Sequence, residues 1–344
     1  MENSPSLQQR RDLYHAAIEF KKIEPWQWMD DSDLFGVQNP QDGQIGYCCV
    51  LGALGQVFGL ALYLGEKGLG GYLKIQSGEI PPEDIDALYI QDCLMASFDD
   101  RKLLEKSDLK IIKSLGLNFR GSKAWPLFRR YEPGYQPWYL NKEETMFLTI
   151  ALQQAKEVAF HLRENRDLLN PPMENHCLVR VAKYEGETLN WKNEWSRLPT
   201  LERRVTGIPV VDQLRLHRLK KKASFSQVIL EVDSFFAPFV IQEGEKPFFP
   251  HISLWVDHRS GLVLKHHLSK REEFKAEFQN EILNLFEEVK SLPSEIRVRQ
   301  KESFKLLEPI TSTLGIKLKL VKKLLALEDA KEHMKNYFLS GRFK

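Results

Sequence analysis

The second half of the chain has an order of predicted elements that few folds accommodate. Alternating and continuous apolar runs predict three consecutive strands, and the remainder alternates helix and strand. A turn at DHRSG pairs the second and third strands as a hairpin, whereas helices link the later strands as parallel crossovers require. The predicted strands are 228–240, 246–258, 260–269, 295–300 and 316–321, and the predicted helices are 270–292, 303–315 and 327–341.

The first half predicts a less regular mixture of helices and strands. A helix is expected over 6–23, a hairpin over 45–65, a strand over 88–99, and a helix capped by Asn141. Further expected elements are a helix over 107–116, an edge or irregular segment over 125–140, and a hairpin over 177–199. The fold class is therefore α/β (α+β).

Residues 199–223 mark the predicted boundary between two domains. The stretch contains two prolines and the helix-forming run PVVDQLRLHRLKKKA, in which basic residues predominate. We expect a mixed α/β domain at 1–198, a basic linker helix at 199–223 and a second α/β domain at 224–344.

Charge is spread unevenly along a nearly neutral chain. The 344 residues carry 49 Lys and Arg against 47 Asp and Glu, a net charge of +2, which excludes a uniformly basic nucleic-acid binder. The last 48 residues, however, hold 12 basic and five acidic side chains. Arg297 and Arg299 on the fourth strand lie near Lys317 and Lys319 on the fifth. They form a candidate surface for an anionic partner, or else charges that protect a sheet edge.

Apolar content and cysteine spacing exclude several classes of protein. Hydrophobic residues make up 42% of the chain, which excludes disorder as its main state. No run approaches the roughly 18 apolar residues of a membrane span, and the start lacks the apolar core of a secretory signal. The four cysteines form no CxxC pair, so we expect free buried thiols in a cytoplasmic protein.

Two resemblances follow from these segments. The order of elements over roughly 226–340 resembles the ribonuclease-H-like fold of nucleases, transposases and integrases. The whole chain also resembles an uncharacterised family of bacterial two-domain proteins. PWQWMDDSDLFGVQNP and IGYCCVLGALGQVFGLALYLGEKGL carry the second resemblance in the first half, and VILEVDSFFAPFV and HISLWVDHRSGLVL in the second. It implies a cytoplasmic bacterial protein with no assigned activity.

The ribonuclease-H-like resemblance implies where catalytic acids would stand. Such enzymes hold two magnesium ions with carboxylates from the first strand, the fourth strand or first helix, and the last helix. Asp233 matches the first position, and Glu328 or Asp329 matches the last. The fourth strand departs from the pattern, because Arg299 stands where an integrase has an aspartate and a cation repels a metal.

We therefore expect a degenerate, non-catalytic domain that binds a protein or a nucleic acid, with no cofactor and no membrane partner. The alternative is a divergent magnesium-dependent nuclease that uses Asp233 with Glu328 or Asp329.

Two further clusters have both a functional and a structural interpretation. Trp26, Trp28 and Asp30 lie in an aromatic and acidic segment that fits a partner-binding loop or a loop anchored in the core. The hairpin histidines fit a zinc or iron site, but solvated cross-strand pairs are the favoured interpretation, so no metal site is predicted. The residues of that hairpin cluster are His251, Asp257, His258, His266 and His267.

Overall fold

The computed structural model describes residues 3–81, 85–186, 188–200, 207–270 and 273–339. Two compact units divide the chain, Met1–Leu201 and Glu202–Lys344, and they are called the first and the second unit below. Both mix helices with strands, which confirms the predicted α+β class. Within the described residues, no helix is long and apolar enough to cross a membrane.

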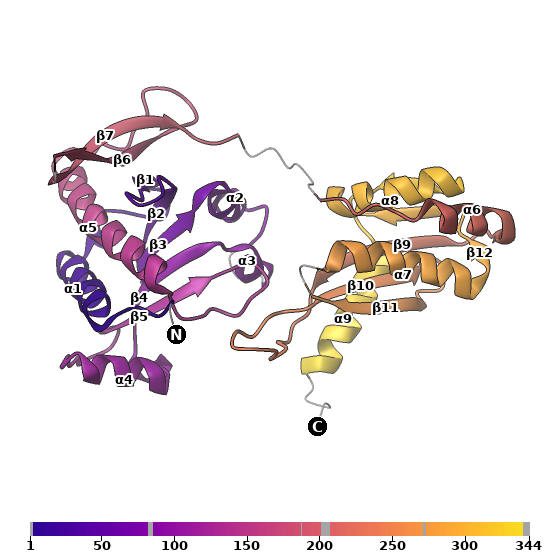
Figure 1. Cartoon of the computed structure of the whole chain (residues 1–344), viewed down its shortest axis with the longest axis horizontal. Coiled ribbons are helices and arrows are strands. Elements are labelled where there is room, and N and C mark those ends of the chain that lie inside the picture. The colour runs from indigo at the N-terminus through magenta and orange to yellow at the C-terminus, as the bar shows by residue number, and fades with distance from the viewer. Residues whose placement is uncertain (1–2, 82–84, 187, 201–206, 271–272, 340–344) are drawn as a thin grey trace. The chain divides into compact units, whose positions relative to one another are not determined.

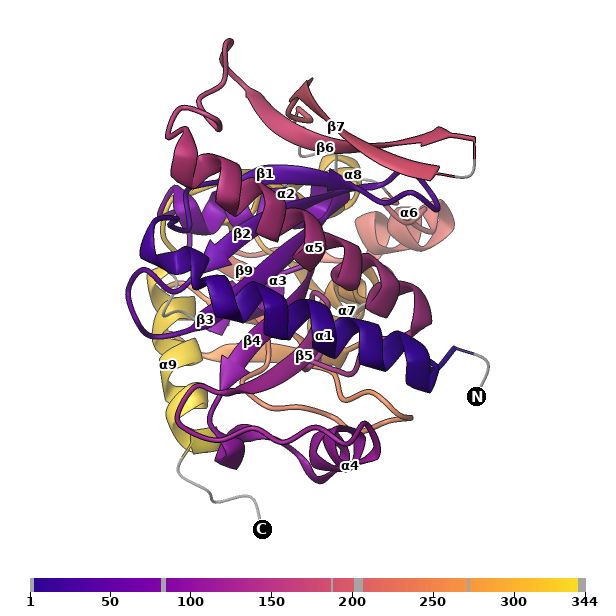
Figure 2. The ribbon, with the colours of Figure 1, turned by 90° about the vertical axis from the view of Figure 1, so that its left-hand side faces the viewer.

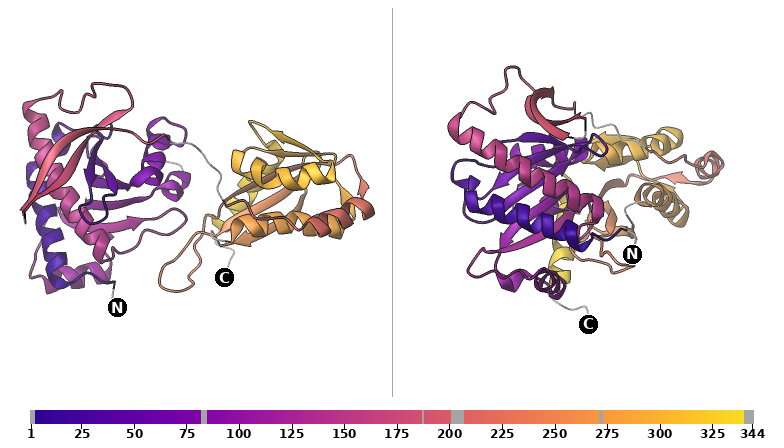
Figure 3. Two further views of the ribbon diagram at one scale, coloured as in Figure 1. Left: turned by 45° about the horizontal axis from the view of Figure 1, so that its top comes forward. Right: turned by 60° about the vertical axis from the view of Figure 1, so that its left-hand side comes forward.

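A seven-stranded sheet forms the centre of the first unit (Figure 1). Its strand order is β5-β4-β3-β2-β1-β6-β7. Neighbours pair antiparallel except β1 and β6, which are parallel, and the β6–β7 hairpin extends the sheet beyond β1 (Figure 3). The strands are β1 (Phe35–Gln38), β2 (Ile45–Leu51), β3 (Phe58–Leu64), β4 (Cys93–Asp99), β5 (Trp125–Tyr131), β6 (His176–Glu185) and β7 (Thr188–Arg197).

Two long helices, α1 (Leu7–Ile23) and α5 (Lys142–Glu164), lie across one face of this sheet (Figure 2). Each begins at a capping box, in which Ser6 or Asn141 accepts a hydrogen bond from the backbone of the third helical residue. Their apolar sides enclose the main core with strand residues such as Phe35 and Leu62. The predicted helix over 6–23 and the Asn141 cap are confirmed.

The opposite face carries α2 (Gly65–Gln76) and α3 (Ile85–Ile90). A second apolar cluster here includes Cys49, Cys93 and Cys177, and Cys48 lies in the main core. All four cysteines are free and buried, as predicted. The remaining elements of this unit are η1 (Pro25–Gln27), η2 (Arg101–Leu103) and α4 (Lys106–Ser114).

The strand expected over 88–99 is shorter than predicted. Strand β4 begins at Cys93, and the preceding apolar residues belong to α3. A short continuous apolar run fits a buried helix as well as a buried strand, so its periodicity did not separate the two.

In the second unit, five strands form a sheet of order β11-β10-β9-β13-β14. The first hairpins, β9–β10 and β10–β11, are antiparallel, whereas β13 runs parallel to both β9 and β14. The strands are β9 (Ile229–Phe236), β10 (His251–Asp257), β11 (Val263–Ser269), β13 (Glu295–Val298) and β14 (Lys317–Leu320). A separate pair joins β8 (Ser224–Phe225) to β12 (Ser291–Leu292).

Helices cover both faces of the second sheet. Helices α7 (Phe274–Val289) and α8 (Lys301–Leu314) enclose a core with Val232 and Ile296, while α9 (Leu325–Leu339) packs on the other face against β10. Helix α6 (Gln213–Lys222) forms inside the predicted linker 199–223, but it buries Leu216 and Leu219 in the core of the second unit. This helix is thus packed into the second unit.

We predict that Gly59→Ala destabilises the first unit by about 2–4 kcal/mol. An added Cβ at Gly59 would lie 2.2 Å from the backbone oxygen of Ala96 on the paired strand. Gly78→Ala is the control: its φ is +70° and nothing lies within 4 Å of the added carbon, so it costs only about 1 kcal/mol. Urea unfolding measures both changes, and equal costs would contradict the steric argument.

Candidate functional site

Asp233 and Glu328 share one cation. Asp233 lies on the central strand β9 and is 1% exposed. One nitrogen of Arg299, Nη2, lies 3.4 Å from Asp233 Oδ2, and the other, Nη1, lies 3.8 Å from Glu328 Oε1. The third predicted acid, Asp329, is exposed to solvent. Strand β9 and helix α9 thus bring two of the predicted acids to one place, and the Arg299 guanidinium bridges them.

The hairpin histidines point to separate partners. His251 stacks on Phe274 with ring centroids 4.4 Å apart, while His267 Nε2 lies 2.9 Å from Glu277. Asp257 accepts hydrogen bonds from the backbone of the turn that follows it. Among the described residues, no group of three or more His, Cys, Asp or Glu is placed to hold a metal ion.

A second buried acid, Glu231, begins a polar chain on the α9 face. Its carboxylate accepts a hydrogen bond from the Leu327 backbone in the first turn of α9 (2.9 Å) and pairs with His258. The negative charge therefore lies at the positive end of that helix dipole. His258 Nε2 lies 3.0 Å from Arg297 Nη1, so the chain continues onto the next strand.

Cations from neighbouring strands meet at Glu295. Register pairing places Arg297 beside Lys319 and Glu295 beside Lys317 on the α9 face of β13 and β14. Glu295 accepts from Arg297 Nε and Lys319 Nζ, each at 2.7 Å. Burial alone raises the pKa of Glu295, but the Lys319 and Arg297 hydrogen bonds outweigh it and hold that pKa below its ordinary value.

We predict that Glu295→Gln costs about 1–2 kcal/mol of unfolding free energy at pH 7. A carboxylate with a lowered pKa in the folded state stabilises the protein above its ordinary pKa. That contribution is lost as the pH falls through the lowered folded-state pKa, so the difference between wild type and variant should shrink as the pH is taken from 7 into the acid range. Urea unfolding across that range measures the difference. The control is Glu302→Gln, which removes an exposed ion pair with Lys275 and should change little.

The aromatic and acidic segment near residue 30 is anchored in the first unit. Trp26 contacts Phe58 and Phe98 at centroid distances of 5.0 and 5.9 Å, and Trp28 Nε1 donates to the backbone oxygen of Ala159. Asp30 accepts from Ser32 within its own turn. These contacts favour the interpretation of this segment as a loop anchored in the core, since both tryptophans are part-buried against it.

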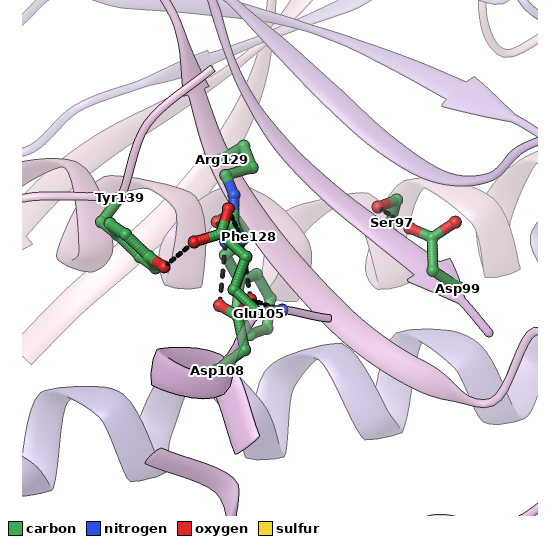
Figure 4. Close-up of polar contacts among 7 residues, drawn as sticks. All are labelled: Ser97, Asp99, Glu105, Asp108, Phe128, Arg129 and Tyr139. Carbon is green, nitrogen blue, oxygen red and sulfur yellow. Dashed lines mark hydrogen bonds and ion pairs between the residues drawn. The ribbon is translucent and has the colours of Figure 1, made fainter. Parts of the chain in front are cut away.

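The most elaborate charged cluster of the first unit is one that sequence reasoning missed (Figure 4). Arg129 on β5 donates to both carboxylate oxygens of Asp108 on α4, at 2.9 and 2.7 Å, and both residues are buried. It also lies 3.4 Å from Glu105, which accepts from the Tyr139 hydroxyl. Burial alone lowers the pKa of Arg129, but the hydrogen bonds and charge of Asp108 raise it above its ordinary value.

We predict that Asp108→Ala destabilises the protein by about 3–5 kcal/mol, because it leaves Arg129 buried without its bidentate partner. The paired change Asp108→Leu with Arg129→Met should cost clearly less than Asp108→Ala alone. Urea unfolding of the single and double variants measures the coupling. A double variant at least as unstable as the single one would contradict this explanation.

Comparison with known families finds one match in each part of the chain. Residues 11–180 match the family described as Domain of unknown function (DUF7309). Residues 215–335 match the family described as Domain of unknown function (DUF6930). The pair of matches fits an uncharacterised two-domain family. No curated protein and no solved structure matches the chain.

Proposed function

We propose that the second unit is a ribonuclease-H-like domain that binds nucleic acid without cleaving it. Numbering its five main strands in chain order gives the sheet order 3-2-1-4-5, with the second strand antiparallel to the first and the fourth and fifth parallel to it. This is the arrangement expected of that fold. The four free, buried cysteines support the further proposal of a reducing, cytoplasmic setting.

The contact of Arg299 with both Asp233 and Glu328 carries the non-catalytic part of the proposal. Two-metal hydrolysis needs several carboxylates free to coordinate cations at the reacting phosphate. Here the single positive charge of Arg299 contacts both acids and offsets one of their two negative charges. A divalent ion entering this place would meet the repulsion of a guanidinium within a few ångströms.

A group of cations beside that place supports the binding part. We call Arg297, Lys317, Lys319, Lys322 and Lys323 the basic strip. The Lys317 side chain is 63% exposed and that of Lys319 40%. Lys322 and Lys323, in the turn after β14, are exposed as well. Strand register spaces such side chains along the sheet surface, and phosphate backbones are bound by cations arranged in this way.

We expect single- or double-stranded DNA or RNA to bind the full chain in 50 mM salt and to weaken steeply toward 200 mM. Replacing Lys317, Lys319 and Lys322 by Gln should lower affinity at least about tenfold and flatten the slope of log K against log salt. Fluorescence anisotropy with labelled oligonucleotides measures both quantities. The matched control replaces Lys220, Lys221 and Lys222 by Gln on α6, which packs with α8 away from the α9 face.

Absence of binding at low salt would overturn the nucleic-acid proposal, and an equal loss in the α6 control would overturn the assignment of binding to the basic strip. Cleavage is tested separately by incubating the same oligonucleotides with Mg²⁺ or Mn²⁺. Metal-dependent cleavage that disappears in Asp233→Asn would establish the nuclease alternative instead. A wild-type protein that binds the oligonucleotides but does not cleave them supports both parts of the proposal.

A further inference from the structure

A cavity of about 620 Å³ opens between α1 and α4 in the first unit. The segment 138–140 closes one side, and Phe128 of β5 and Thr145 of α5 contribute to its lining. Pockets that hold small molecules range over about 300–1,000 Å³. The volume therefore suits a ligand of one or two rings.

Aromatic side chains line much of this cavity. Tyr14 and Phe128 meet edge to face, with centroids 4.9 Å apart and an interplanar angle of 84°. Trp138 and Tyr139 form a second such pair, at 5.4 Å and 73°. Flat rings stack on or pack edge-on against such surfaces, so the lining favours a planar aromatic ligand over an aliphatic one.

The charges around the cavity favour an anion. Asp108 is the acid among the lining residues, and the bidentate hydrogen bonds from Arg129 neutralise it. Two cations line the cavity as well, Arg10 from α1 and Lys110 from α4. Arg10 uses Nε to donate to the backbone of Pro5, and a guanidinium has further donors for a second group.

Tyr14 adds a neutral hydrogen-bond donor. It is 4% exposed and lines the cavity, and among the described residues none forms a hydrogen bond with its hydroxyl. Burial, assisted by the charge of Asp108, raises the pKa of Tyr14 well above its ordinary value. The hydroxyl thus keeps its proton at neutral pH and can donate it to an anionic oxygen.

We propose that this cavity is a binding site for a small aromatic anion, a planar ring that carries a carboxylate or a phosphate. The ring lies among Tyr14, Phe128 and Trp138. The anionic group lies toward Arg10 and Lys110, within reach of the Tyr14 hydroxyl. This site belongs to the first unit and is independent of nucleic-acid binding by the second.

Titration of the full chain with matched ligands tests the proposal. Indole-3-acetate and adenosine monophosphate are the anionic probes, and indole-3-ethanol and adenosine are their neutral counterparts. Calorimetry should show at least one anion binding about tenfold or more tighter than its neutral counterpart in 50 mM salt, because cations line the cavity. The tighter of the two anions identifies the group as carboxylate or phosphate. For the adenosine pair, which lacks the indole emission of the other probes, quenching of tryptophan fluorescence provides a second readout, since Trp138 lines the cavity.

Paired variants locate the binding. Arg10→Gln with Lys110→Gln should weaken the anion at least about tenfold and leave the neutral counterpart unchanged. The control, Arg11→Gln with Lys113→Gln, removes two exposed cations from the same helices but outside the lining. Thermal unfolding verifies that all variants fold. Failure of both anions to bind below 1 mM ligand (a Kd limit equivalent to about −4 kcal/mol), or equal weakening by the control pair, would overturn the proposal.

Discussion

A charge removed from water needs partners inside the protein, and the polar architecture of both units follows from this constraint. In the first unit, Asp108 and Arg129 are both buried and satisfy each other through two hydrogen bonds that join α4 to β5. In the second, Glu231 is 1% exposed and bonds to His258 and to the first turn of α9. These pairs fix where helices sit on their sheets, because each partner lies on a different element.

The order of the main helices and strands along the second unit was predictable, because most of them have a clear apolar period or a clear terminator. Apolar residues spaced by four, from Phe274 to Phe286, predict α7. Gly315, in a left-handed conformation, ends α8. The sequence of the first unit has a less regular pattern of apolar residues. There residues 88–90 are apolar and precede the polar Gln91 and Asp92, and these apolar residues belong to α3, which contacts α2. The 199–223 stretch has the composition of a charged, solvated linker, yet Val211 and two leucines of α6 are buried in the core of the second unit.

The candidate sites also differ in how far the sequence predicts them. Asp233, Arg299 and Glu328 lie near one another, and the ribonuclease-H-like resemblance implies such a meeting of the first strand, the end of the fourth and the last helix. The Asp108–Arg129 pair had no comparable signal. Arg129 is one of two adjacent arginines in an aromatic strand, and its partner lies 21 residues earlier on a short helix. Strand alternation turns the two arginines to opposite faces, but a sequence does not say which face of an edge strand is covered or that both are, as here.

The two proposed binding sites use one electrostatic arrangement. In each, an arginine neutralises a buried acid, Arg129 with Asp108 and Arg299 with Asp233, while further cations stay near the surface. Each internal pair removes one positive and one negative charge together, so the charges that remain still sum to +2. A nearly neutral chain presents a positive surface only where its unpaired cations gather apart from its unpaired acids, because an exposed lysine contributes its charge locally. Net charge excludes a uniformly basic protein, and the uneven placement of the unpaired charges decides where an anion is attracted.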